Sequence, residues 1–174
     1  MNLDIAESLT RWSVRLAIAC YLARVLGEVG GVSIKKRMAV WQKSRRYWSA
    51  GCVFYLIHVA CAFGFFHQWS HQNAYQHTAI ETAAVTGVHW GGGIYLNYLF
   101  TLFWVSEVLL WWFYGIDFPY RSRCYFWTTH FVFATMVVNA TVVFGPPYWL
   151  GIAGLVLILI GLRYWRRGRI VSGR

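Results

Sequence analysis

The chain has 174 residues and a formal net charge of +10, with 58% hydrophobic, 20% aromatic and only 13% charged residues. Soluble domains usually carry about 25% charged residues, so this composition excludes a disordered chain, a collagen, a coiled coil and a small disulfide-stapled domain. It predicts an all-α integral membrane protein that contacts the lipid bilayer. The basic residues cluster between apolar runs, which argues against nucleic acid as a partner.

A membrane-spanning helix needs about 20 mostly apolar residues. Five segments meet or approach this length, and we expect a bundle of five transmembrane helices within a single membrane domain, 1–174. The candidate spans, in chain order, are 12–29, 48–68, 93–115, 124–145 and 148–165.

The first candidate span, 12–29, is the least apolar because it contains Arg15, Arg24 and Glu28. Polar and small residues recur in it every three or four positions and so share one helical face: Ser13, Ala17, Cys20, Arg24 and Glu28. This face indicates either a spanning helix that packs against its neighbours, with Arg24 paired to Glu28, or an interfacial helix with its polar side in water. In the second case four helices span the membrane.

The orientation follows from the positions of the basic residues. They fall before the second span (Lys35, Lys36, Arg37, Lys43, Arg45 and Arg46), after the third (Arg121 and Arg123) and in the tail (Arg166, Arg167, Arg169 and Arg174). Because cytoplasmic loops carry an excess of Lys and Arg, we expect these three segments in the cytoplasm and the N-terminus outside, as in a protein of the bacterial inner membrane. Segment 69–92 has no Lys or Arg and is predicted to be exoplasmic.

Beyond the first candidate span, three ionisable residues lie deep inside the predicted spans: His58 in the second, Glu107 in the third and His130 in the fourth. At 1.5 Å of rise per residue they fall within about 6 Å of one level. Ionisable residues are costly in a membrane and by default indicate function. We expect His58 and His130 to ligate a b-type haem from opposite sides, with Glu107 accepting a proton from a ring nitrogen or from a quinol. A hydrogen-bonded clamp between helices and a proton relay are the alternatives.

A second group of side chains is predicted outside the membrane, as candidate ligands of zinc or copper: His67, His71, His77, Glu81 and His89. His67 and His71 are four residues apart and would share one face of a helix, and His77 and Glu81 repeat that spacing. Imidazole and carboxylate ligands suit zinc and copper. The HExxH pattern is missing, however, and a polar helix extension whose histidines face water explains the same residues.

Three function classes remain open. The first is a membrane redox protein, associated with haem b or quinone, whose layout is similar to that of small membrane b-type cytochromes. The second is a non-catalytic accessory subunit of a membrane complex, whose polar residues only lock helices together; Asn97 and Asn139 are expected to bond across helices in this way. The third is a zinc- or copper-binding membrane protein. The sequence contains no nucleophile elbow or Walker motif.

Overall fold

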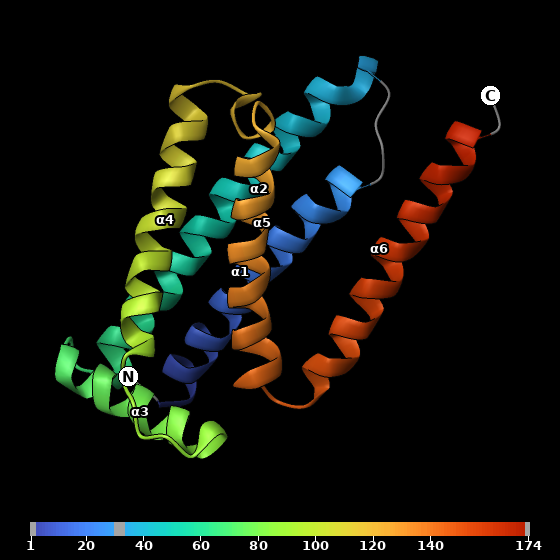
Figure 1. Cartoon of the computed structure of the whole chain (residues 1–174). Coiled ribbons are helices and arrows are strands. Elements are labelled where there is room, and N and C mark those ends of the chain that lie inside the picture. The colour runs from blue at the N-terminus through green and yellow to red at the C-terminus, as the bar shows by residue number, and fades with distance from the viewer. Residues whose placement is uncertain (1–2, 30–33, 173–174) are drawn as a thin grey trace.

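The computed structural model describes residues 3–29 and 34–172, with side chains at 4–29 and 37–165 (Figure 1). Arg174 lies outside the described residues, as do the side chains of Lys35, Lys36, Arg166, Arg167 and Arg169. The described chain is all-α, with six α-helices and no strand. The helices are α1 (Leu3–Val29), α2 (Ile34–Cys61), α3 (His71–Thr86), α4 (Gly93–Phe113), α5 (Arg123–Val138) and α6 (Tyr148–Ser172). Three short turns complete the order: the π turns η1 (Ala62–Phe66) and η3 (Asn139–Val143), and the 3₁₀ turn η2 (Phe118–Tyr120).

Four of the described helical segments are long and apolar enough to cross a membrane: Arg37–Phe66, Gly93–Phe113, Arg123–Val143 and Tyr148–Trp165. The expected fifth span, 12–29, lies within α1, which has 27 residues but is not among the four. Four spans are thus supported by length and composition. Whether α1, which carries Arg15, Arg24 and Glu28 in this segment, spans the membrane or lies at its surface stays a prediction. Its packing against α2 is nevertheless the most extensive contact between helices in the described chain.

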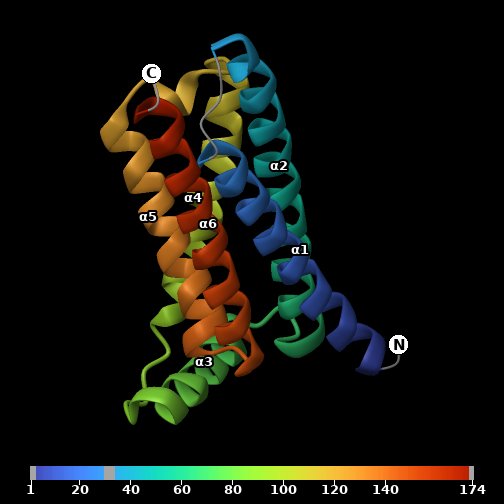
Figure 2. The ribbon, with the colours of Figure 1, turned by 90° about the vertical axis from the view of Figure 1, so that its right-hand side faces the viewer.

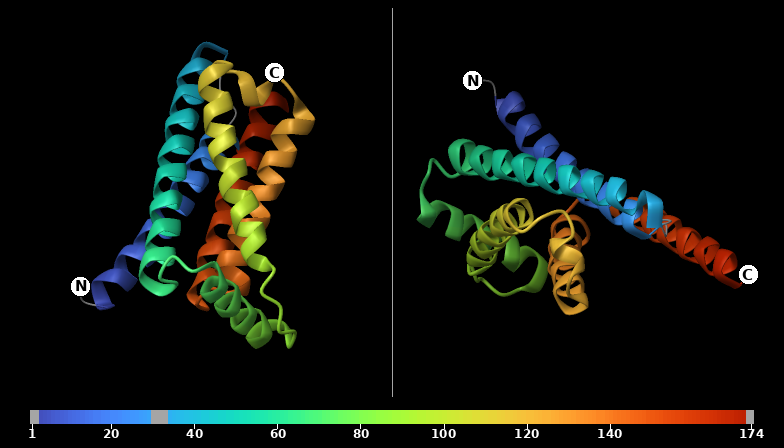
Figure 3. Two further views of the ribbon diagram at one scale, coloured as in Figure 1. Left: turned by 90° about the vertical axis from the view of Figure 1, so that its left-hand side faces the viewer. Right: turned by 90° about the horizontal axis from the view of Figure 1, so that it is seen from above.

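The two ends of the bundle differ in charge. Figure 1 shows the start of α2, η2 and the C-terminal part of α6 at one end, which we call the basic end. The N-terminal part of α1 and the whole of α3 lie at the other, which we call the histidine end (Figures 1 and 3). The three segments with clustered Lys and Arg thus meet at a single end, as the predicted orientation requires.

Helix α2 is longer than the sequence pattern predicted. The basic segment before the expected span 48–68 forms the first turns of α2, which begins at Ile34. Lys, Arg, Gln, Met and Ala are good helix formers, so the helix continues out of its apolar part. The basic segment is therefore helical at the basic end.

The chain between α2 and α3 contains a sharp turn. Gln68 and Trp69 have φ angles of 51° and 58°, and α3 begins after Ser70, whose side chain accepts a hydrogen bond from the Asn73 amide at 3.3 Å. His67 follows η1 as its C-cap, whereas His71 opens α3. The prediction that His67 and His71 share one helical face is therefore wrong, because the turn separates them.

Aromatic rings form the centre of the bundle. Phe133 of α5 packs against Trp48, Trp104 and Phe100, with ring centroids 4.2, 4.7 and 4.7 Å away. These four buried residues, from α2, α4 and α5, are called the aromatic layer. Helix α6 stands apart from it (Figure 1) and contacts α1 and η3, and the N-terminal part of α1 leans away from the bundle (Figure 2).

Candidate functional site

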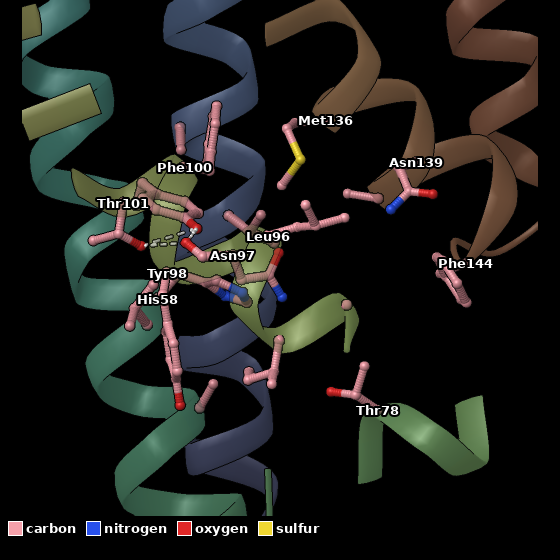
Figure 4. A pocket seen from close by; sticks show the side chains of 18 of the residues that line it. His58, Thr78, Leu96, Asn97, Tyr98, Phe100, Thr101, Met136, Asn139 and Phe144 are labelled. Carbon is pink, nitrogen blue, oxygen red and sulfur yellow. Dashed lines mark hydrogen bonds between the residues drawn. The ribbon is translucent and has the colours of Figure 1, made fainter. Parts of the chain in front are cut away.

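A cavity of about 480 Å³ lies between the aromatic layer and α3 (Figure 4). Residues of α1, α2, α4 and α5 line it, together with residues of α3 and of the turns η1 and η3. The lining is mainly apolar and includes Val59, Ile94, Leu96, Met136, Val137 and Phe144. Small-molecule sites usually measure about 300–1,000 Å³ and combine apolar walls with a few polar groups. The cavity thus has the size and lining of a binding site.

His58 lines this cavity from α2. Its Nδ1 lies 2.9 Å from the backbone oxygen of Thr10 in α1. A carbonyl oxygen only accepts, so Nδ1 carries the proton in this hydrogen bond, and Nε2 of the neutral ring keeps its lone pair. Among the described residues Nε2 has no partner. His58 therefore offers a hydrogen-bond acceptor to any molecule in the cavity.

Two side-chain amides border the same cavity, Asn97 from α4 and Asn139 from η3 (Figure 4). The backbone oxygen of Asn97 accepts from the Thr101 hydroxyl at 2.7 Å, and the Tyr55 hydroxyl lies 3.5 Å from it. No hydrogen bond joins the two amides, so the predicted bond between Asn97 and Asn139 is corrected. Each amide offers donors and an acceptor to the cavity instead.

Both π turns border the cavity. Ala62 and Phe63 of η1 form part of one wall, and Asn139 and Ala140 of η3 form part of another. Turns of this type commonly end a helix. Here they place the ends of two helices beside the cavity.

His67 and His77 line the end of the cavity near α3, with ring centroids 5.3 Å apart. Partial burial and the neighbouring His77 lower the pKa of His67. Glu81 follows one turn after His77 on α3 and also lines the cavity. Within the described part of the chain, no three His, Cys, Asp or Glu side chains gather as a metal site, and zinc or copper binding stays a prediction.

The other two histidines of this end lie apart from the cavity. His71 contacts two tyrosines of α4: its Nδ1 lies 2.9 Å from the Tyr98 hydroxyl, and its Nε2 lies 3.4 Å from the Tyr95 hydroxyl. His89 is exposed in the loop before α4. The five predicted metal ligands are thus dispersed between the cavity and the surface.

A second polar region lies between the aromatic layer and the basic end. We call it the ion cluster; its members are Arg24, Glu28, Glu107, Tyr120, Tyr125 and His130. Arg24 Nε donates to Glu28 Oε1 at 2.9 Å, and only 1% and 9% of the two side chains are exposed. This confirms the predicted pair.

The Arg24 guanidinium also lies over two indole rings, 4.0 Å from the ring centroid of Trp48 and 4.7 Å from that of Trp111. Cation–π attraction is strongest where water is excluded. Nη1 and Nη2 have no hydrogen-bond partner among the described residues. Arg24 is therefore held by one carboxylate and two aromatic faces.

Glu28 receives contacts from three elements. Besides Arg24 of its own helix, the Tyr120 hydroxyl donates to Oε1 at 2.7 Å, and His130 Nε2 lies 3.3 Å from Oε2 without hydrogen-bond geometry. Burial, followed by the charge of Glu28, raises the pKa of Tyr120. Glu28 thus connects α1 to η2 and α5.

Glu107 is buried in α4 and accepts a hydrogen bond from the Tyr125 hydroxyl of α5. The sequence pattern predicted a histidine or a quinol as the partner of Glu107. In the structure the partner is a tyrosine, and the pair connects α4 to α5 within the ion cluster.

The structure does not bring His58 and His130 together. His58 contacts Thr10, whereas the Tyr21 hydroxyl donates to the backbone oxygen of His130 at 3.3 Å. Thr10 and Tyr21 are eleven residues apart on α1, or about 16 Å at the helical rise. The two imidazoles do not face each other as axial ligands of one iron do, and haem binding stays a prediction.

Sequence reasoning missed Tyr120 and Tyr125. Both fall near the predicted turn after the third span, where an interfacial tyrosine is ordinary. It also missed Thr10, because a backbone oxygen carries no side-chain signal. The pairing of Arg24 with Glu28 could be predicted because both residues lie on one helix, four positions apart.

Comparison with known proteins finds no matching family model, no matching curated protein and no matching solved structure. The function is therefore inferred from the geometry of this chain.

Proposed function

We propose that this polytopic membrane protein binds a membrane-soluble ring compound that carries a hydroxyl group, of the quinol class, in the cavity. The observation that carries the proposal is the environment of His58. Its Nδ1–H is bonded to Thr10, which leaves Nε2 as an acceptor within a mainly apolar cavity. An acceptor there selects a ligand with a hydroxyl donor, because an unpaired buried polar group is costly.

The walls favour a flat ring. Tyr55, Phe100, Trp104 and Phe133 line the cavity, and aromatic rings pack well in stacked and edge-to-face arrangements. The amides of Asn97 and Asn139 supply donors for a second oxygen on the ring, as a quinol or its oxidised form would present. Four apolar helices suggest an integral membrane location, where such compounds dissolve.

The proposed orientation places the basic end in the cytoplasm by the positive-inside rule. The cavity then lies in the half of the membrane that faces away from the cytoplasm, and α3 lies at its outer end. A ligand of this class would enter from the bilayer or from the exoplasmic side.

The test compares two probes on the purified protein in lipid nanodiscs: decylubiquinol and its dimethyl ether, which lacks hydroxyl donors. Quenching of tryptophan fluorescence reports binding, since Trp104 lines the cavity. We expect the quinol to bind about tenfold more tightly than the ether, the value of one net hydrogen bond of about 1.4 kcal/mol. Equal binding of the two probes would contradict the proposal.

The variant His58→Phe keeps a ring of similar size and removes the acceptor. The Thr10 oxygen keeps the Ser13 hydroxyl as a donor at 3.0 Å, so the variant should fold. We expect it to lose the preference for the quinol over the ether. His71→Phe is the matched control, because His71 lies outside the cavity lining, and it should bind as the wild type does. The visible spectrum of the same sample, oxidised and reduced, tests the haem prediction.

A further inference from the structure

A second cleft, of about 340 Å³, lies at the basic end between α1, α2 and α6. Its polar lining consists of Lys43, Ser44 and Tyr47 from α2 and Arg163 from α6. Ala23 and Gly27 of α1 also line it, and a Cβ atom built on Gly27 would meet no atom within 4 Å. The small residues leave room beside two cations.

The cleft is cationic. Lys43 and Arg163 come from different helices, and none of the described residues that line the cleft is acidic. Arg163 Nη1 donates to the backbone oxygen of Leu26, which holds the guanidinium beside the cleft. In the sequence, Arg166, Arg167 and Arg169 follow within six residues of Arg163.

The position of the cleft matches that of lipid headgroups. Arg163 lies two residues before the end of the apolar segment Tyr148–Trp165, which places it near a membrane–water boundary. Tyr47 is an amphipathic side chain of the kind enriched at that boundary. Basic pockets between transmembrane helices on the cytoplasmic side bind anionic headgroups.

We propose that this cleft binds the phosphate headgroup of an anionic phospholipid, with Lys43 and Arg163 as the two cationic contacts. Helix α6 lacks buried residues in its most apolar stretch, and it contacts α1 and η3 within the bundle. A phosphate held between Lys43 and Arg163 joins α6 to α2. The lipid is then a structural component that keeps α6 beside the bundle.

The test is a binding titration by native mass spectrometry of the purified full chain, with phosphatidylglycerol as the anionic probe and phosphatidylcholine as the zwitterionic one. We expect the wild type to prefer phosphatidylglycerol. Each cation near a membrane surface is worth about 1 kcal/mol, or about fivefold in affinity. Lys43→Gln should therefore weaken phosphatidylglycerol binding about fivefold, and the double variant with Arg163→Gln about 30-fold.

The matched control is Arg37→Gln with Arg46→Gln. It removes the same charge from the same end, but neither residue lines the cleft, so it should weaken phosphatidylglycerol binding clearly less than the cleft double variant does. Equal losses in the two double variants would overturn the proposal, because they would show attraction by net charge alone. Lys43→Arg, which keeps the charge, should bind as the wild type does.

Inorganic phosphate distinguishes the two sources of the ligand. A lipid site gains affinity from the acyl chains, so millimolar phosphate should leave phosphatidylglycerol bound. Displacement of the lipid by millimolar phosphate would overturn the lipid assignment in favour of a free-anion site. Neither outcome depends on the His58 cavity, which is a separate part of the bundle.

Discussion

Arg24 donates from Nε to Glu28 Oε1 across 2.9 Å, one turn along the same helix, with 1% and 9% of the two side chains exposed. A pair in water at this spacing contributes only about 0.3–0.5 kcal/mol. A buried pair behaves differently, because removal of one partner leaves an uncompensated charge away from water.

Arg24→Met should therefore lower the free energy of unfolding by about 3–5 kcal/mol. The double variant with Glu28→Gln should recover most of that loss, since the remaining charge is removed as well. Unfolding in mixed detergent micelles, followed by circular dichroism, measures both. The control is Arg11→Gln: Arg11 pairs with Glu7 on the same helix at the same spacing, but 66% and 46% of the two side chains are exposed. A loss in the control equal to that in Arg24→Met would contradict the role assigned to burial.

The orientation can be tested with cysteine labelling. Cys124 is exposed at the start of α5 near the basic end, and Thr86 is exposed at the end of α3. Two single-cysteine chains are compared: one keeps only Cys124, and the other lacks all four native cysteines and carries Thr86→Cys. We expect a membrane-impermeant maleimide to label Thr86→Cys in intact cells, and Cys124 only after the membrane is permeabilised. The opposite pattern would place the basic end outside.

The His67–His77 pair predicts a pH dependence. The pKa of His67 is lowered by partial burial and by His77, so the unfolded chain binds this proton more readily than the folded one. The contribution of neutral His67 to stability is then complete above about pH 6.5 and is lost as the pH falls through its lower folded pKa.

His77→Gln removes the neighbouring charge and should raise the pKa of His67. NMR titration of labelled histidine rings measures the change. His71→Gln serves as the control, because His71 does not contribute to the shift. If His67 titrates identically with and without His77, the proposed interaction between the two rings is absent.

The long apolar runs made the main helices predictable. The expected segment 93–115 differs by two residues from α4, Gly93–Phe113, because nothing in that run competes with a helix. The basic start of α2 was not predictable in the same way. Its residues are good helix formers, but the prediction relied on their charge, which indicates exposure to water and not where a helix begins.

The candidate site was only partly predictable. His58 was identified as intramembrane and lines the cavity, but its level relative to His130 depends on where α2 begins and how α1 crosses it. The sequence-based prediction counted the depth of each residue from the assumed inner end of its span. It therefore could not include the true start of α2 or the way α1 crosses it. The partner of Glu107 was missed for the same reason, since Tyr125 meets it only through the packing of α5 on α4.

The aromatic layer divides the interior. The Tyr21 hydroxyl points from one side of it toward His130, and the Tyr55 hydroxyl lies on the other side beside Asn97. Between them, Trp48, Trp104 and Phe133 are packed ring against ring, which leaves little room for a file of water molecules. The packed rings thus separate the cavity from the ion cluster, so a molecule bound in the cavity would not touch the ion cluster.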